Sequence, residues 1–140
     1  ILFYKLCYMK KITLILTCFL LLIVAKSGLA QPKEKWPELE AFHEVMSKTF
    51  HPAEEGKLDP IKTRSYEMVQ KAIAWKNSTA PAGYDKNAVT KTLKKLVKGA
   101  KELNNMVQRN AADNEIKEEL TELHEVFHEI TEKCKSGDHH

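Results

Sequence analysis

Apolar residues recur at intervals of four and three positions along two long stretches of this 140-residue chain. The first of these stripes consists of Val89, Leu93, Leu96, Ala100, Leu103 and Val107. The second consists of Ile116, Leu120, Leu123, Phe127, Ile130 and Cys134. This spacing places all members of a stripe on one face of an α-helix. Each stretch is therefore predicted to be an amphipathic helix with one buried face.

Two further stripes precede these. The first starts at Trp36-Pro37 and consists of Leu39, His43, Met46 and Phe50. His51-Pro52 is expected to end or kink this helix, because proline disfavours the helical conformation in the residue before it. The second stripe consists of Ile61, Ser65, Met68, Ala72 and Trp75. Its helix is expected to start at Asp59 as the N-cap, with Pro60 in the first helical position.

These four amphipathic segments are joined by short connections, and no segment alternates apolar and polar residues as a half-buried strand does. The prediction is an all-α fold, an antiparallel up-down-up-down four-helix bundle. It is expected to be a single domain over residues 31–140 with a short polar C-terminal tail.

Residues 1–30 are expected to lie outside this domain. Two lysines at positions 10 and 11 precede an apolar run over residues 12–24, and Gly28 and Ala30 follow as small residues. This layout is typical of a secretory signal peptide cleaved after Ala30, with upstream sequence before Met9. A retained membrane helix is the alternative, but the run is short for a membrane span. The domain is therefore predicted to be secreted, in the periplasm, with no stable membrane span after cleavage.

Removal of this leader changes the charge of the chain. Taking its four lysines from the 22 basic residues leaves 18, against 19 acidic residues. The excess of basic charge thus belongs to the leader, and no nucleic-acid partner is indicated. Two of the three cysteines also lie in the leader, which leaves Cys134 without an internal disulfide partner. Cys134 is open to three roles: a buried apolar group, the link of a homodimer, or a metal ligand.

His124 and His128 are the main candidates for chemistry. Residues four apart lie on one face of a helix, so both imidazoles could bind one ion of zinc, copper or nickel. In an up-down bundle the first and last helices are neighbours, and counting along them places His43 level with residue 123. The predicted metal ligands are therefore His43, His124 and His128, with His51 further away. The alternative is that these histidines are surface residues without a ligand.

Residues 124–128 also match the His-Glu-x-x-His pattern of zinc proteases. The pattern lies near the end of a small bundle, which leaves no room for a substrate cleft. No phosphate-binding loop or nucleophile elbow is present in the sequence. We therefore predict that the protein is not an enzyme.

Size, export, four helices and a late histidine resemble the periplasmic four-helix-bundle cytochromes, cytochrome c-prime and its b-type relatives. The c-type members carry C-x-x-C-H on the last helix, and His128 matches the histidine of that motif. His124 and Phe127 stand at the cysteine positions, so covalent haem attachment is excluded. The resemblance implies non-covalent haem b as the alternative cofactor, with His128 and either Met46 or His43 as iron ligands, and electron transfer as the function. A third hypothesis is a structural or protein-interaction bundle without a cofactor.

Overall fold

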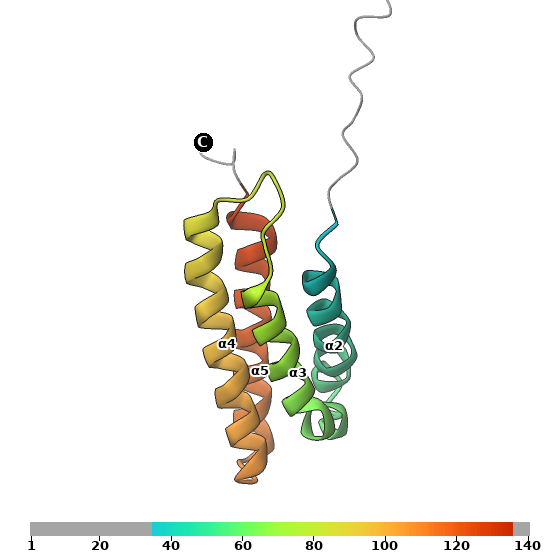
Figure 1. The fold of residues 1–140 in the computed structure, drawn as a ribbon. Coiled ribbons are helices and arrows are strands. Elements are labelled where there is room, and N and C mark those ends of the chain that lie inside the picture. The colour runs from blue at the N-terminus through green and yellow to red at the C-terminus, as the bar shows by residue number, and fades with distance from the viewer. Residues whose placement is uncertain (1–34, 136–140) are drawn as a thin grey trace, which may run out of the picture. The chain divides into compact units, whose positions relative to one another are not determined.

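The computed structural model describes residues 35–135 of the chain, which form four helices (Figure 1). These are α2 (Pro37–Glu54), α3 (Asp59–Asn77), α4 (Lys86–Gln108) and α5 (Asp113–His128), and α5 continues into a π-helical turn, η1 (Glu129–Lys133). The predicted all-α four-helix bundle is confirmed. The predicted leader and the tail histidines, His139 and His140, lie outside the described residues.

Each helix packs against two others. α2 contacts α3 and α5, and α4 also contacts α3 and α5. Trp36 Nε1 donates a hydrogen bond of 2.7 Å to Ser78 Oγ and so ties the start of α2 to the end of α3. Phe50, late in α2, stacks on His124 of α5. Within residues 35–135, no helix is long and apolar enough to cross a membrane.

The core is built from the predicted faces of α3, α4 and α5. Their stripe residues are buried, except that Val107 is half-buried. For α2 the prediction is wrong in part, because His43 is exposed and Leu39 is half-buried. The buried face of α2 consists of Phe42, Val45, Met46, Thr49, Phe50 and Ala53. That face carries more apolar area than one through His43, and burial of apolar area decides how a helix rotates.

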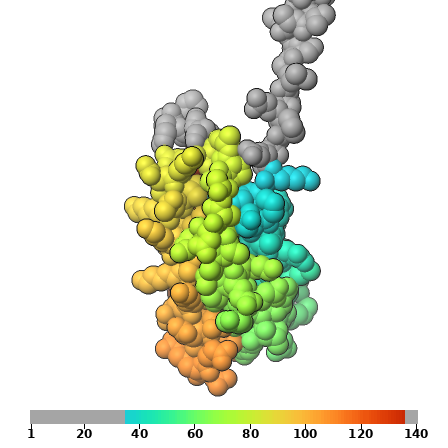
Figure 2. Space-filling model, in the orientation of Figure 1, coloured from blue at the N-terminus to red at the C-terminus, as the bar shows by residue number. Residues whose placement is uncertain are grey.

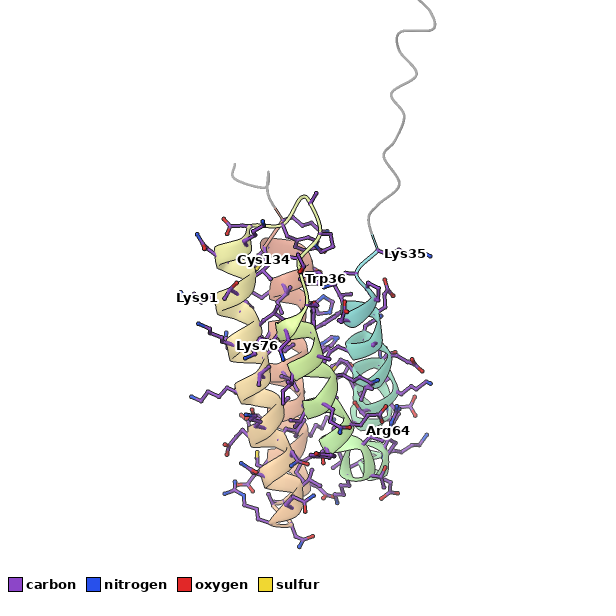
Figure 3. The ribbon with its side chains drawn as sticks, in the orientation of Figure 1. Lys35, Trp36, Arg64, Lys76, Lys91 and Cys134 are labelled. Atoms are coloured by element: carbon purple, nitrogen blue, oxygen red, sulfur yellow. The ribbon has the colours of Figure 1, made fainter. Side chains whose placement is uncertain are left out.

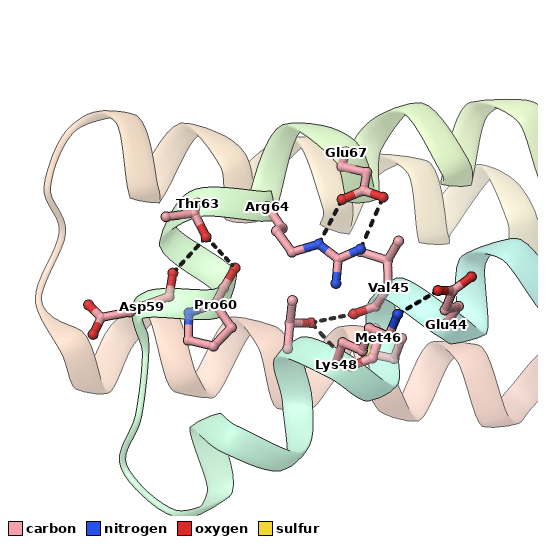
Figure 4. A network of polar contacts seen from close by, with 10 residues as sticks. Glu44, Val45, Met46, Lys48, Asp59, Pro60, Thr63, Arg64 and Glu67 are labelled. Carbon is pink, nitrogen blue, oxygen red and sulfur yellow. Dashed lines mark hydrogen bonds and ion pairs between the residues drawn. The ribbon is translucent and has the colours of Figure 1, made fainter.

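α2 extends beyond His51, and the start of α3 differs from the expectation by one residue. α2 continues through Pro52 and ends at Glu54, with Glu55 as its C-cap residue, and Gly56 follows with a φ of 82°. Gly56 N donates to Ala53 O and Lys57 N to Pro52 O, which is the Schellman pattern that a left-handed glycine permits. In α3, Leu58 is the N-cap residue and Asp59 is the first helical residue. The carbonyl of Asp59 accepts a hydrogen bond from Thr63 Oγ1 (Figure 4).

Cys134 lies just beyond η1 and is 3% exposed, as its place in the stripe predicts (Figure 3). Its carbonyl accepts a hydrogen bond of 2.8 Å from Asp85 N, at the start of α4. Tyr84 and Lys135 form an isolated β-bridge next to it. These contacts hold the end of α5 against the α3–α4 loop, and the burial of Cys134 favours a packing role over an intermolecular disulfide.

Candidate metal centre

His124 and His128 lie on one side of α5, at the edge of its buried stripe. The stripe from Ile116 to Ile130 fixes the rotation of the helix, and Glu115 accepts a hydrogen bond from Ala112 N at its start. Both histidines are consequently half-buried rather than fully exposed. The sequence places them on the same face as neighbours one turn apart, and the structure brings their rings into contact.

The two Nε2 atoms are 3.2 Å apart, and the ring planes are nearly perpendicular at 89°. Zinc binds imidazole nitrogen at about 2.0–2.1 Å, so two nitrogens on neighbouring coordination positions are separated by roughly 2.9–3.4 Å. The observed separation falls in that range. In the structure this separation is that of a hydrogen bond between the two rings, and a transition metal ion could take the place of its proton after small ring rotations that aim both lone pairs at the ion.

Each ring is held by a neighbour outside the pair. The ring of Phe50 stacks on His124 with centroids 3.9 Å apart and planes at 15°. Glu132 Oε1 lies 3.1 Å from His128 Nδ1. A carboxylate that accepts a hydrogen bond from Nδ1–H leaves Nε2 with a free lone pair. Such a carboxylate is a common partner of a metal-bound histidine.

Neither Phe50 nor Glu132 was predicted as part of the site. Glu132 could have been found, because it lies four residues after His128 on the same helical face. Phe50 could not be paired with His124 without the register between α2 and α5.

The other predicted ligands lie apart from the pair. The exposed ring of His43 stacks on Phe127, with centroids 5.1 Å apart and planes at 3°. The exposed His51 pairs with Glu54 at 3.1 Å between Nδ1 and Oε2. Among residues 35–135, no group of three or more His, Cys, Asp or Glu side chains could hold a metal ion. The described residues thus supply two nitrogen ligands rather than three.

Met46, the predicted second haem ligand, is 0% exposed in the core of α2. Iron held between Met46 and His128 would require core side chains to move, and Nε2 of His128 would have to leave His124. This arrangement favours a small ion over haem.

The surroundings of His124 favour the neutral form of its ring. Partial burial of His124, followed by the effect of the nearby His128, lowers the pKa of His124 from its ordinary 6.5. Metal ions bind the neutral imidazole, so a lowered pKa reduces competition from protons. Glu125 and Glu54 act on His124 in the opposite direction, as nearby negative charges that would also attract a cation.

The lowered pKa predicts a pH-dependent stability. Below about pH 6.5 the unfolded chain protonates His124 more readily than the folded chain does, so stability is expected to fall as pH decreases through this value. Urea unfolding at about pH 7.5 and about pH 5.5 measures the loss, and the His124→Ala variant should lose less than the parent. Equal losses in both proteins would show that His124 does not carry the effect.

Comparison of the chain with known protein families, with curated proteins and with solved structures finds no match. The functional argument therefore depends on the geometry of the histidine pair.

Proposed function

We propose that this protein is an exported, periplasmic four-helix bundle that binds one divalent transition metal ion through His124 and His128. The observation that carries the proposal is the 3.2 Å separation of the two Nε2 atoms. The role is metal binding, sensing or buffering. Water or a group from another molecule fills the remaining coordination positions, because two imidazoles alone do not complete a coordination sphere.

Two neighbouring side chains, Phe50 and Glu132, support the two histidines in different ways. Phe50 covers one face of the His124 ring and restricts its rotation, which lowers the entropy lost when the metal binds. Glu132 accepts a hydrogen bond from Nδ1 of His128, which leaves Nε2 of His128 free for the metal ion. Copper is expected to bind more tightly than nickel or zinc, since imidazole sites follow that order of affinity.

Titration of the purified protein with copper, nickel and zinc ions tests the proposal. One ion per chain is expected, with copper tightest and with weaker binding below about pH 6.5. Calorimetry gives the stoichiometry, and histidine ring resonances in NMR spectra identify the ligands. Because His139 and His140 could chelate metal independently, the titration is also made in a His139→Ala/His140→Ala background.

Two outcomes would overturn the proposal. One is loss of all binding in the background without the tail histidines. The other is a Soret absorption band in protein from its native host, which would favour the haem b alternative. No metal and no Soret band would leave a bundle that acts through protein contacts.

A further inference from the structure

The charges of α4 and α5 are strongly segregated. α4 contains six lysines and one glutamate, and α5 contains six carboxylate side chains and one lysine. On α4 the exposed lysines that face away from the core are Lys91, Lys94, Lys98 and Lys101, here called the lysine ridge. On α5 the corresponding exposed carboxylates are Glu118, Glu122 and Glu125, here called the glutamate ridge. The long side chains of α4 project from the left of the molecule in Figure 2.

A surface groove of about 360 Å³ lies between α4 and α5, and one residue of each ridge, Lys98 and Glu122, lines it. Gly99, Leu123 and Val126 also line the groove, but Leu123 and Val126 are only 1% and 8% exposed, so the apolar surface at its floor is narrow. A Cβ atom on Gly99 would lie 3.1 Å from Leu123 Cδ1, so the absence of a side chain there allows the helices to approach closely. The groove thus separates a mainly basic helix surface from an acidic one, so a partner here would be held mainly by charge complementarity.

Most of these charges have no ionic partner within residues 35–135. Beside the groove, Lys95 pairs with Glu129 at 3.3 Å, and no ridge residue takes part in an ion pair among the described residues. Burial of Glu119, with Glu122 and Glu102 nearby, raises the pKa of the Glu119 carboxyl. Glu102 is the one acid on the α4 side. The α5 side of the groove is therefore a surface on which added positive charge would be favourable.

We propose that a second copy of this chain docks on this face, with the lysine ridge of each copy against the glutamate ridge of the other. A twofold axis that lies in the interface and runs parallel to the helices places α4 of one copy against α5 of the other. The lysine ridge of each copy then faces the glutamate ridge of its partner. A twofold axis across the helices would instead place lysine opposite lysine. Charge complementarity thus selects one of the two symmetric arrangements.

Contacts between α4 and α5 show which of their residues lie at the same height along the helix axes. Lys95 pairs with Glu129, and Thr92 lies beside Cys134, so the two helices pass each other in opposite directions. Lys101 is therefore close to the level of Glu122, and Lys98 to that of Glu125. In the proposed dimer these residues meet across the interface while the two apolar floors face each other.

A charge exchange tests this arrangement. The lysine-ridge variant is Lys98→Glu/Lys101→Glu, and the glutamate-ridge variant is Glu118→Lys/Glu122→Lys. The parent is expected to dimerise at low ionic strength and to dissociate as salt is added, since the Debye length falls to about 3 Å at 1 M. Each variant alone is expected to be monomeric, because like charges then face each other. An equimolar mixture of the two is expected to form a heterodimer.

Sedimentation velocity measures all three states, and circular dichroism checks that the variants remain folded. Lys35→Glu/Lys57→Glu makes the same change of charge away from the groove and should dimerise like the parent. A monomeric parent at millimolar concentration would overturn the proposal, and so would association of either variant as tight as the parent's. A mixture that remains monomeric would overturn the arrangement of the ridges.

Discussion

His124→Ala and His128→Ala are each expected to weaken metal binding by more than about 100-fold. Loss of a second-shell partner of a metal ligand commonly costs 10–100-fold, and loss of one ligand from a pair removes the chelate itself. Both variants should fold, because the rings lie at the edge of the core and alanine is the best helix former. Competition with a chromophoric chelator, at about pH 7.5, measures the affinities.

Three further variants are compared with His124→Ala and His128→Ala. His43→Ala and His51→Ala should bind as the parent does, because neither ring contacts the pair. Glu132→Gln keeps the neighbouring side chain but removes its charge, and should weaken binding by about tenfold. Parent-like affinity in both α5 variants would show that the pair is not the site. A large loss with His43→Ala would instead show that metal binding draws α2 into a three-histidine site.

Most of the fold could be predicted, because in α3, α4 and α5 the apolar residues at helical spacing are also the residues that the structure buries. Each of these helices has one continuous apolar stripe, so only one rotation buries it. In α2, two partly overlapping stripes compete, one through His43 and one through Phe42 and Thr49. The spacing of apolar residues alone did not separate them, and the aromatic packing of Phe42 on Trp75 and Phe127 decides the rotation.

The histidine pair could be predicted for a different reason. Two residues four apart on one helix have a separation fixed by the helix itself, whatever surrounds them. The position of His43 depends instead on the register between two helices, which loop lengths and tilt determine. Counting placed His43 level with residue 123, whereas its ring lies on Phe127, about one turn further along α5. Local geometry was thus predictable from sequence, and the contacts between helices were not.

Trp75→Ala is expected to lower the free energy of unfolding by about 3–5 kcal/mol, the cost of removing a large aromatic side chain from a core. Trp75 is 0% exposed near the end of α3. Its ring centroid lies 5.5 Å from those of Trp36 and Phe42 and 5.9 Å from that of Phe127. The residue thus joins α2, α3 and α5 at one end of the bundle. Urea unfolding followed by circular dichroism measures the change.

Trp75→Phe separates packing from hydrogen bonding at this position. Within the described residues, the buried Nε1 of Trp75 has no hydrogen-bond partner, and such a donor costs about 1–3 kcal/mol. Phenylalanine removes that donor and keeps an aromatic ring, so its loss of stability should be clearly smaller than that of alanine. Tyr66→Ala, at a 62% exposed position of the same helix, should change stability by less than about 0.5 kcal/mol. If Trp75→Ala were as mild as Tyr66→Ala, the end of α3 would not be packed against α2 and α5, and the aromatic cluster would not stabilise the bundle.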